Sequence, residues 1–206
     1  MASEGADTVL LLCDYQNKIL SGFGEDGAAA QAEYAATLAA AAHDANIPVV
    51  WVRVAFRPGA PEIPPSQKFL YALKEAGAVS QLEEGSEGAA LHPVAAAAVG
   101  PDDVDVIKRR VGAFSGSDLA VVLAGLCGDS FGSPRLRRMY LAGVSTSGVV
   151  LSTVRAAGDM DIPMTVVSDA CADRDDEVHR VLMEKVFPRH ADVKTTAEVI
   201  ELMKGK

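Results

Sequence analysis

The sequence of 206 residues contains few of the residues that build metal sites and disulfide frameworks. Its three cysteines, Cys13, Cys127 and Cys171, are an odd set without metal-ligand spacing, which argues against a disulfide framework and is typical of a reducing compartment. The four histidines are scattered along the chain and also lack ligand spacing. We therefore expect no metal, and the sequence gives no indication of a cofactor.

Long apolar runs and an excess of basic residues are absent as well. No stretch approaches the roughly 18 consecutive apolar residues that a membrane helix needs, and residues 1–8 are small and acidic, unlike a signal peptide. The net charge of −9 argues against general binding to a phosphate backbone. We therefore expect a cytoplasmic protein that binds a small-molecule substrate, with no nucleic acid and no membrane as partner.

The sequence does contain a regular alternation of short apolar runs and longer segments of helical period. The runs predict strands over residues 9–14, 48–54, 104–108, 138–143, 164–169 and 191–194. The segments between them predict helices over 28–46, 67–76, 117–126, 147–159, 175–186 and 197–204, with loops at 55–66 and 125–135. Strands separated by helices form parallel sheets with helices on both faces. We therefore expect a three-layer α/β/α Rossmann-like fold with a six-stranded parallel sheet, in one domain spanning residues 1–206.

Two charged residues and one turn stand at the carboxyl ends of predicted strands. Asp14 ends the first apolar run, Lys108 ends the third, and the turn 143–149 follows the fourth. Open α/β sheets place their active sites at this edge. Burial would raise the pKa of Asp14 toward a value useful for proton transfer. The ammonium group of Lys108 would stabilise the negative charge of the Asp14 carboxylate. Alternatively, Asp14 caps a turn and Lys108 extends its ammonium group to solvent.

At this point the chain resembles the isochorismatase-like hydrolases, also called the cysteine hydrolase superfamily. The resemblance rests on LLLCDYQN at residues 10–17, IKRRVGAFSGSD at 107–118 and AGVSTSGVV at 142–150, and it continues at 167–173 and 177–179. It implies that Asp14 is the general acid or base and that Lys108 is its electrostatic partner. It also implies a cis peptide bond between Val144 and Ser145, and assembly as a dimer or tetramer.

The resemblance places Val149 where most members of the family have their nucleophile. In those members the turn after the fourth strand is Thr-x-x-Cys, and the cysteine attacks the substrate; counted from Thr146, that position is Val149. A valine side chain cannot attack, donate or accept. The neighbouring hydroxyl residues would each need a base to become nucleophiles, and capping of the following helix is the simpler role. These residues are Ser145, Thr146, Ser147 and Ser152.

Two functional hypotheses follow from the missing thiol. In the first, the protein is a hydrolase of a vinyl ether or a C–N bond that relies on Asp14 and Lys108. True isochorismatases resemble this chain in lacking the cysteine, with glycine at the position of Val149, and they cleave a vinyl ether by protonating carbon. In the second, the protein is a catalytically silent pseudoenzyme or a small-molecule-binding protein that retains the pocket.

The residues expected to bind substrate lie on the turn and on the loops near it. Backbone N–H groups at the start of the helix after the turn can also bind a developing oxyanion. The expected substrate-binding residues are Gln16, Phe23, Phe56, Arg57, Phe114, Val144, Ser145, Thr146, Ser147 and Gly148.

Overall fold

The structure is a computed structural model and describes residues 7–128 and 136–205. Within these residues six strands form one parallel sheet in the order β3-β2-β1-β4-β5-β6. The strands are β1 (Thr8–Cys13), β2 (Val49–Val54), β3 (Val104–Lys108), β4 (Arg138–Val144), β5 (Met164–Ala172) and β6 (Asp192–Lys194). This arrangement, with helices on both faces, confirms the predicted three-layer α/β fold.

The helices agree with the predicted segments and add several short ones. The α-helices are α1 (Asn17–Leu20), α2 (Gly24–Asp44), α3 (Lys68–Glu75), α4 (Pro93–Ala97), α5 (Leu119–Leu126), α6 (Leu151–Gly158), α7 (Asp176–Val181) and α8 (Thr196–Lys204). The π-helical turns are Thr146–Val150 and Leu182–Val186, and the 3-10 helices are Ser21–Phe23, Ala78–Leu82, Glu87–Ala89 and Phe187–Arg189. The predicted loop at 55–66 is irregular, and most of the loop predicted at 125–135 lies outside the described residues.

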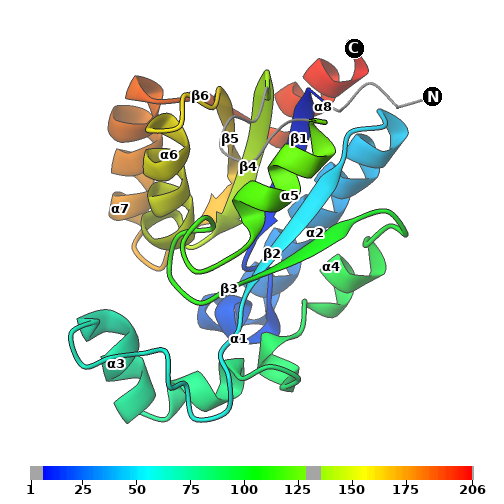
Figure 1. The fold of residues 1–206 in the computed structure, drawn as a ribbon. Coiled ribbons are helices and arrows are strands. Elements are labelled where there is room, and N and C mark those ends of the chain that lie inside the picture. The colour runs from blue at the N-terminus through cyan, green and yellow to red at the C-terminus, as the bar shows by residue number, and fades with distance from the viewer. Residues whose placement is uncertain (1–6, 129–135, 206) are drawn as a thin grey trace.

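Alternation along the strands divides the interior into two cores, one on each face of the sheet. In β1, Leu11 and Cys13 share a core with α5, α6 and the π-helical turn Leu182–Val186, whereas Leu10 and Leu12 share one with α2, α4 and α8. Figure 1 shows the sheet between these two layers of helices. Because helices cover both faces, every residue of β1 is buried, as expected for a strand inside a parallel sheet. In the described part of the chain, no helix is long and apolar enough to cross a membrane.

The strand order reverses between β1 and β4, which marks the place where open α/β sheets bind their ligands. Asp14 follows β1 with a backbone φ of 63°, a left-handed conformation that aspartate tolerates better than most residues. The peptide bond between Val144 and Ser145, at the end of β4, is cis, as the family resemblance predicted. In Figure 1, α1 and the segment that carries α3 lie beyond the carboxyl ends of β1 and β2.

A buried carboxylate fastens β2 to the turn that precedes β3. The side chain of Asp103 is 4% exposed, and its Oδ2 accepts hydrogen bonds from Trp51 Nε1 at 2.8 Å and from Gly100 N at 2.9 Å. Its Oδ1 lies 2.7 Å from Nε2 of His43, near the end of α2. Three separate parts of the chain therefore depend on one side chain.

Asp103→Ala is expected to lower the free energy of unfolding by about 2–3 kcal/mol, because the indole N–H of Trp51 and the N–H of Gly100 would lose their acceptor. Urea denaturation of the purified protein measures the change. Asp102→Ala is the matched control, since Asp102 is exposed. Equal stabilities of the two variants would contradict the structural role of Asp103.

Candidate active site

The centre of the site is an ion pair between Asp14 and Lys108. Lys108 Nζ lies 2.8 Å from Asp14 Oδ2, and the two side chains are 2% and 7% exposed. Lys108 Nζ also donates to the carbonyl of Arg110 at 3.1 Å, which fixes the ammonium group at the end of β3. The other carboxylate oxygen, Asp14 Oδ1, is buried and accepts no hydrogen bond from any described residue. One oxygen of Asp14 is therefore held by a cation, and the other is buried without a partner among the described residues.

Burial determines the acidity of this carboxyl group. Loss of water raises the pKa of Asp14 above its ordinary value, while the charge and hydrogen bond of Lys108 oppose the rise. The net effect is a raised pKa, so at a given pH more of Asp14 is protonated than of an exposed aspartate. A carboxyl group of this kind is suited to donate a proton.

The turn after β4 carries Val149 to the same site and is held from two sides. The N–H of Ser147 donates to Asp173 Oδ2 at 2.6 Å, and Thr146 Oγ1 lies 2.8 Å from Nδ1 of His179 on α7. The N–H of Gly148 donates to the carbonyl of Ser145 at 3.2 Å. Two of the N–H groups that we expected to bind a developing oxyanion therefore already have acceptors within the protein, and the expectation is corrected for those two.

A cavity of about 610 Å³ lies over the ion pair and the turn. Its walls are mostly apolar and come from the loops after β1 to β5 together with the segment that carries α3. The lining residues are Asp14, Lys18, Ile19, Phe23, Val54, Phe56, Phe69, Leu70, Leu73, Ala78, Val79, Leu82, Lys108, Arg110, Val111, Val144, Ser145, Ser147, Gly148, Val149, Asp173 and Arg174. A cavity of this size and composition accommodates a small organic molecule.

The structure brings together most of the side chains singled out in the sequence and leaves four outside the lining. The predicted site residues that line the cavity are Asp14, Lys108, Val149, Phe23, Phe56, Val144, Ser145, Ser147 and Gly148.

The four that do not line it have other surroundings. The amide of Gln16 is buried and bonds the backbone of Val54 and Ala89. Arg57 is exposed beside Glu62, 3.7 Å away, and Phe114 packs against the core on the α5 face. Thr146 is fully buried behind the turn.

Several lining residues carried no recognisable signal in the sequence. Phe69, Leu70 and Leu73 lie on α3, where the period shows a helix but not which surface the helix faces. Arg174 was missed because β5 extends to Ala172, three residues beyond its predicted end at 169. With the correct end, Arg174 follows a strand just as Asp14 does.

The described residues offer neither a metal site nor a reactive thiol in the cavity. No group of three or more His, Cys, Asp and Glu side chains within 7–128 and 136–205 is arranged to hold a metal ion. Cys13 and Cys171 belong to the core beneath the sheet edge. Burial raises the pKa of Cys171 to about 12 and also raises the pKa of Cys13, so both thiols stay protonated.

The fold and this site define a class of three-layer α/β proteins with a cavity at the carboxyl ends of a parallel sheet, and comparisons with known proteins identify the family. Residues 8–198 match the Isochorismatase domain family, so the chain belongs to the isochorismatase family. It is 30% identical over 198 residues to the uncharacterized isochorismatase family protein YecD of Escherichia coli O157:H7, covering 95% of this chain and 96% of that protein.

Solved structures agree with this result. An isochorismatase family protein from Burkholderia thailandensis has 25% identity and a TM-score of 0.76, and the match covers 98% of this chain and all of that one. A cysteine hydrolase from Pseudomonas syringae pv. phaseolicola 1448A has a TM-score of 0.80 at 19% identity, over 100% of this chain and 99% of that chain, which shows the shared fold.

Lys108→Met is expected to destabilise the protein by about 3–5 kcal/mol near neutral pH, because it leaves the buried carboxylate of Asp14 without a cation. The loss should shrink as pH falls, since a protonated Asp14 tolerates an apolar environment. Urea denaturation at several pH values tests the prediction. Lys185→Met is the matched control, since Lys185 is exposed. A loss of stability in Lys108→Met that does not depend on pH would contradict the prediction.

Proposed function

We propose that the protein hydrolyses a small molecule by acid–base chemistry of Asp14 and Lys108, without a covalent intermediate on the protein. The observation that carries the proposal is the asymmetry of the Asp14 carboxyl group. Oδ2 is held 2.8 Å from Lys108 Nζ, while buried Oδ1 has no described partner and belongs to a residue that lines the cavity. Oδ1 can therefore carry the proton that reaches the substrate.

The chemistry that this arrangement supports best is hydrolysis of a vinyl ether. Protonated Asp14 donates its proton from Oδ1 to the terminal carbon of the double bond, whose electron pair forms the new C–H bond. Water adds to the resulting oxocarbenium carbon and returns a proton to Asp14, and the hemiketal then breaks into a ketone and an alcohol. Lys108 stabilises the carboxylate that exists between the two proton transfers.

Val149 is compatible with this route because no step needs a nucleophilic side chain. It is 2% exposed and forms part of the apolar wall. A C–N bond is the second possibility within the same proposal, with ionised Asp14 acting as base toward water. Assembly as a dimer or tetramer and a cytoplasmic location accompany the proposal and rest on the family resemblance and the composition.

The alternative function is binding of a small molecule without turnover. The observation that favours it is that the ion pair of Asp14 and Lys108 is complete without a ligand, as in a structural buried pair. The N–H of Ser147, which could otherwise stabilise an oxyanion, is engaged by Asp173.

Isochorismate, a vinyl ether, is the substrate to test first. The purified protein should release pyruvate, measured by the oxidation of NADH with lactate dehydrogenase, and Asp14→Asn should lower kcat by at least about 100-fold, as expected on removal of a general acid. Asp102→Asn, far from the cavity, is the control. Absence of pyruvate with the unaltered protein would favour the binding function.

The pH dependence of kcat/KM gives an independent check on the role of Asp14. The reactive form is protonated, so activity should be retained below the raised pKa of Asp14 and fall about tenfold per pH unit above it. A rate that increases through the same range would assign Asp14 the role of base and favour C–N cleavage.

Val149→Cys tests whether the cavity also fits amide chemistry. The new thiol would lie in a cavity that contains Lys108, whereas Cys13 and Cys171 are buried in the core. We expect iodoacetamide to modify position 149 before either of them, and we expect slow hydrolysis of simple amides. Val149→Ala is the control. A reactive thiol with no amide turnover across a broad panel would leave vinyl ether hydrolysis as the better assignment.

A further inference from the structure

The polar and apolar side chains that line the cavity come from different segments of the chain. Each charged or hydroxyl side chain of the lining lies at or soon after the carboxyl end of β1, β3, β4 or β5, as Asp14 and Lys108 do. The segment that carries α3 and the 3-10 helix after it contributes only apolar side chains. These are Phe69, Leu70, Leu73, Ala78, Val79 and Leu82. A ligand group that faces this segment therefore meets no polar side chain from it.

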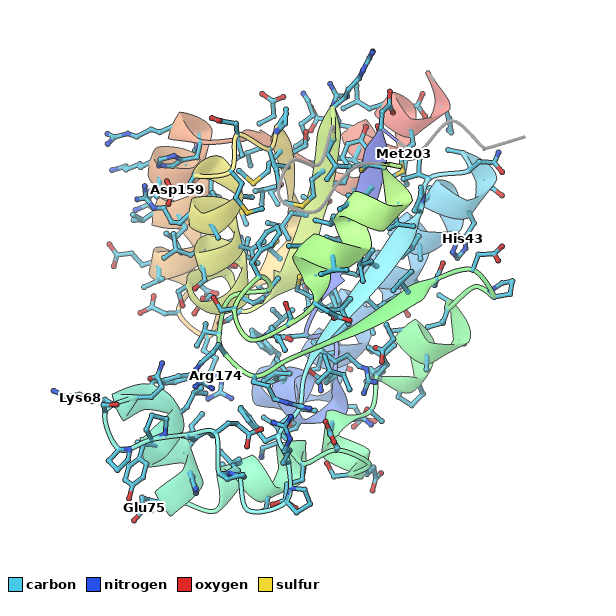
Figure 2. All side chains as sticks on the ribbon, in the orientation of Figure 1. His43, Lys68, Glu75, Asp159, Arg174 and Met203 are labelled. Atoms are coloured by element: carbon cyan, nitrogen blue, oxygen red, sulfur yellow. The ribbon has the colours of Figure 1, made fainter. Side chains whose placement is uncertain are left out.

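This apolar wall belongs to a small hydrophobic cluster of its own, which we call the α3 cluster. It is separate from the two cores on the faces of the sheet. Figure 2 labels Lys68 and Glu75 at the two ends of α3, which lies apart from the layers of helices on the sheet. Five buried members of the α3 cluster also line the cavity, namely Val54, Phe56, Leu70, Val79 and Leu82. The α3 cluster is therefore a core that borders the cavity directly.

Phe69, on α3, extends the apolar wall to solvent. It lines the cavity and yet is 62% exposed, whereas the adjacent Leu70 is 5% exposed and belongs to the α3 cluster. Because Phe69 both lines the cavity and is exposed, it lies where the cavity opens. An exposed phenyl ring at a cavity is typical of a ligand-binding groove, since a bound ligand removes its apolar surface from water.

A hydrocarbon group is the ligand chemistry that such a wall favours. A polar group placed against it would lose hydrogen bonds to water and gain none from the side chains of the wall. A hydrocarbon group gains dispersion contacts with the lining side chains and loses its own contact with water. The wall therefore discriminates against a substrate that is polar throughout.

We infer that the substrate carries a hydrocarbon arm of several carbons, which lies against α3 and the 3-10 helix Ala78–Leu82 while the scissile bond lies at Asp14. The inference deepens the proposed function and rests on it, because Asp14 is the assigned site of cleavage. The side chains at the strand ends act on the bond, and the α3 cluster recognises the arm.

A binding series measures recognition of the arm without any turnover. 1-Butanol, 1-hexanol and 1-octanol each have one hydroxyl group, differ only in the length of the hydrocarbon chain, and contain no bond that the proposed chemistry cleaves. Isothermal titration calorimetry of the full chain should show an affinity that rises about fourfold for each CH2 group that enters the cavity.

Two substitutions in the wall should change this series in different ways. Leu73→Gln places an amide at a half-buried position of the lining and should lower the ratio of 1-octanol to 1-butanol affinity at least about tenfold. Ala78→Leu adds side-chain volume to the lining, so 1-octanol should bind no more tightly than 1-hexanol. Val121→Gln is the matched control, since Val121 is 55% exposed on α5 and lies outside the lining.

Turnover of alkyl vinyl ethers relates the arm to the reacting bond. Hydrolysis consumes one water and releases acetaldehyde and the alcohol, and alcohol dehydrogenase with NADH measures the acetaldehyde. The value of kcat/KM should be at least about tenfold higher for hexyl vinyl ether than for ethyl vinyl ether. Leu73→Gln should remove most of this preference, and Asp14→Asn should lower the turnover of both ethers.

The two proposals fail separately. An alkanol affinity that rises with chain length, and rises less in Leu73→Gln, supports the inference even where no vinyl ether is hydrolysed. Affinities that do not rise with chain length, including no detectable binding of any alkanol, overturn it. So does a rise that neither wall substitution changes, and so do equal kcat/KM values for two ethers that are hydrolysed. None of these results affects a measured release of pyruvate from isochorismate.

Discussion

The buried ion pair between Asp14 and Lys108 is the interaction on which the rest of the site depends. A carboxylate inside an apolar cavity loses its hydration, and only a cation in close contact makes that tolerable. Lys108 ends β3 and Asp14 follows β1, so the pair spans the end of β2 and requires all three strands to be in register. The contact from Lys108 to the carbonyl of Arg110 extends the same constraint to the loop after β3. The sheet is thus the scaffold that holds one acid and one amine in contact.

The burial that costs stability is also the basis of the chemistry that we propose. Desolvation raises the pKa of Asp14, and Lys108 limits the rise, so the carboxyl group is poised between its two protonation states. The wall that includes Val149 is apolar, and electrostatic interactions are stronger beside an apolar surface than in bulk water. A thiol at this position would offer a second, covalent route. Without a thiol there, the route that we propose relies on proton transfer by Asp14.

The sequence predicted the parts of the molecule that follow from strand ends and periodicity. Asp14 and Lys108 stood at the ends of apolar runs, and that was enough to place them at one edge of the sheet. The sequence could not predict that α3 forms a wall of the cavity. The pattern of an amphipathic helix shows that one of its faces is apolar, but not which part of the molecule that face contacts. Gln16 was predicted to bind substrate, and proximity in sequence was misleading for this residue. It stands two residues after Asp14, yet tertiary packing uses its amide to connect β2 with the segment near Ala89, a contact between residues 73 positions apart.

Net charge was the least informative property of the sequence for this site. A total of −9 describes the whole surface, and most of that surface lies beyond the screening length of about 8 Å at physiological ionic strength. The potential inside the cavity is set by the few charges that line it. The two carboxylates of the lining, Asp14 and Asp173, are already engaged there, and the lining residues of the segment that carries α3 have no charge. The overall negative charge therefore decides little about the substrate, because the substrate is surrounded by these few charges and the apolar wall beside them.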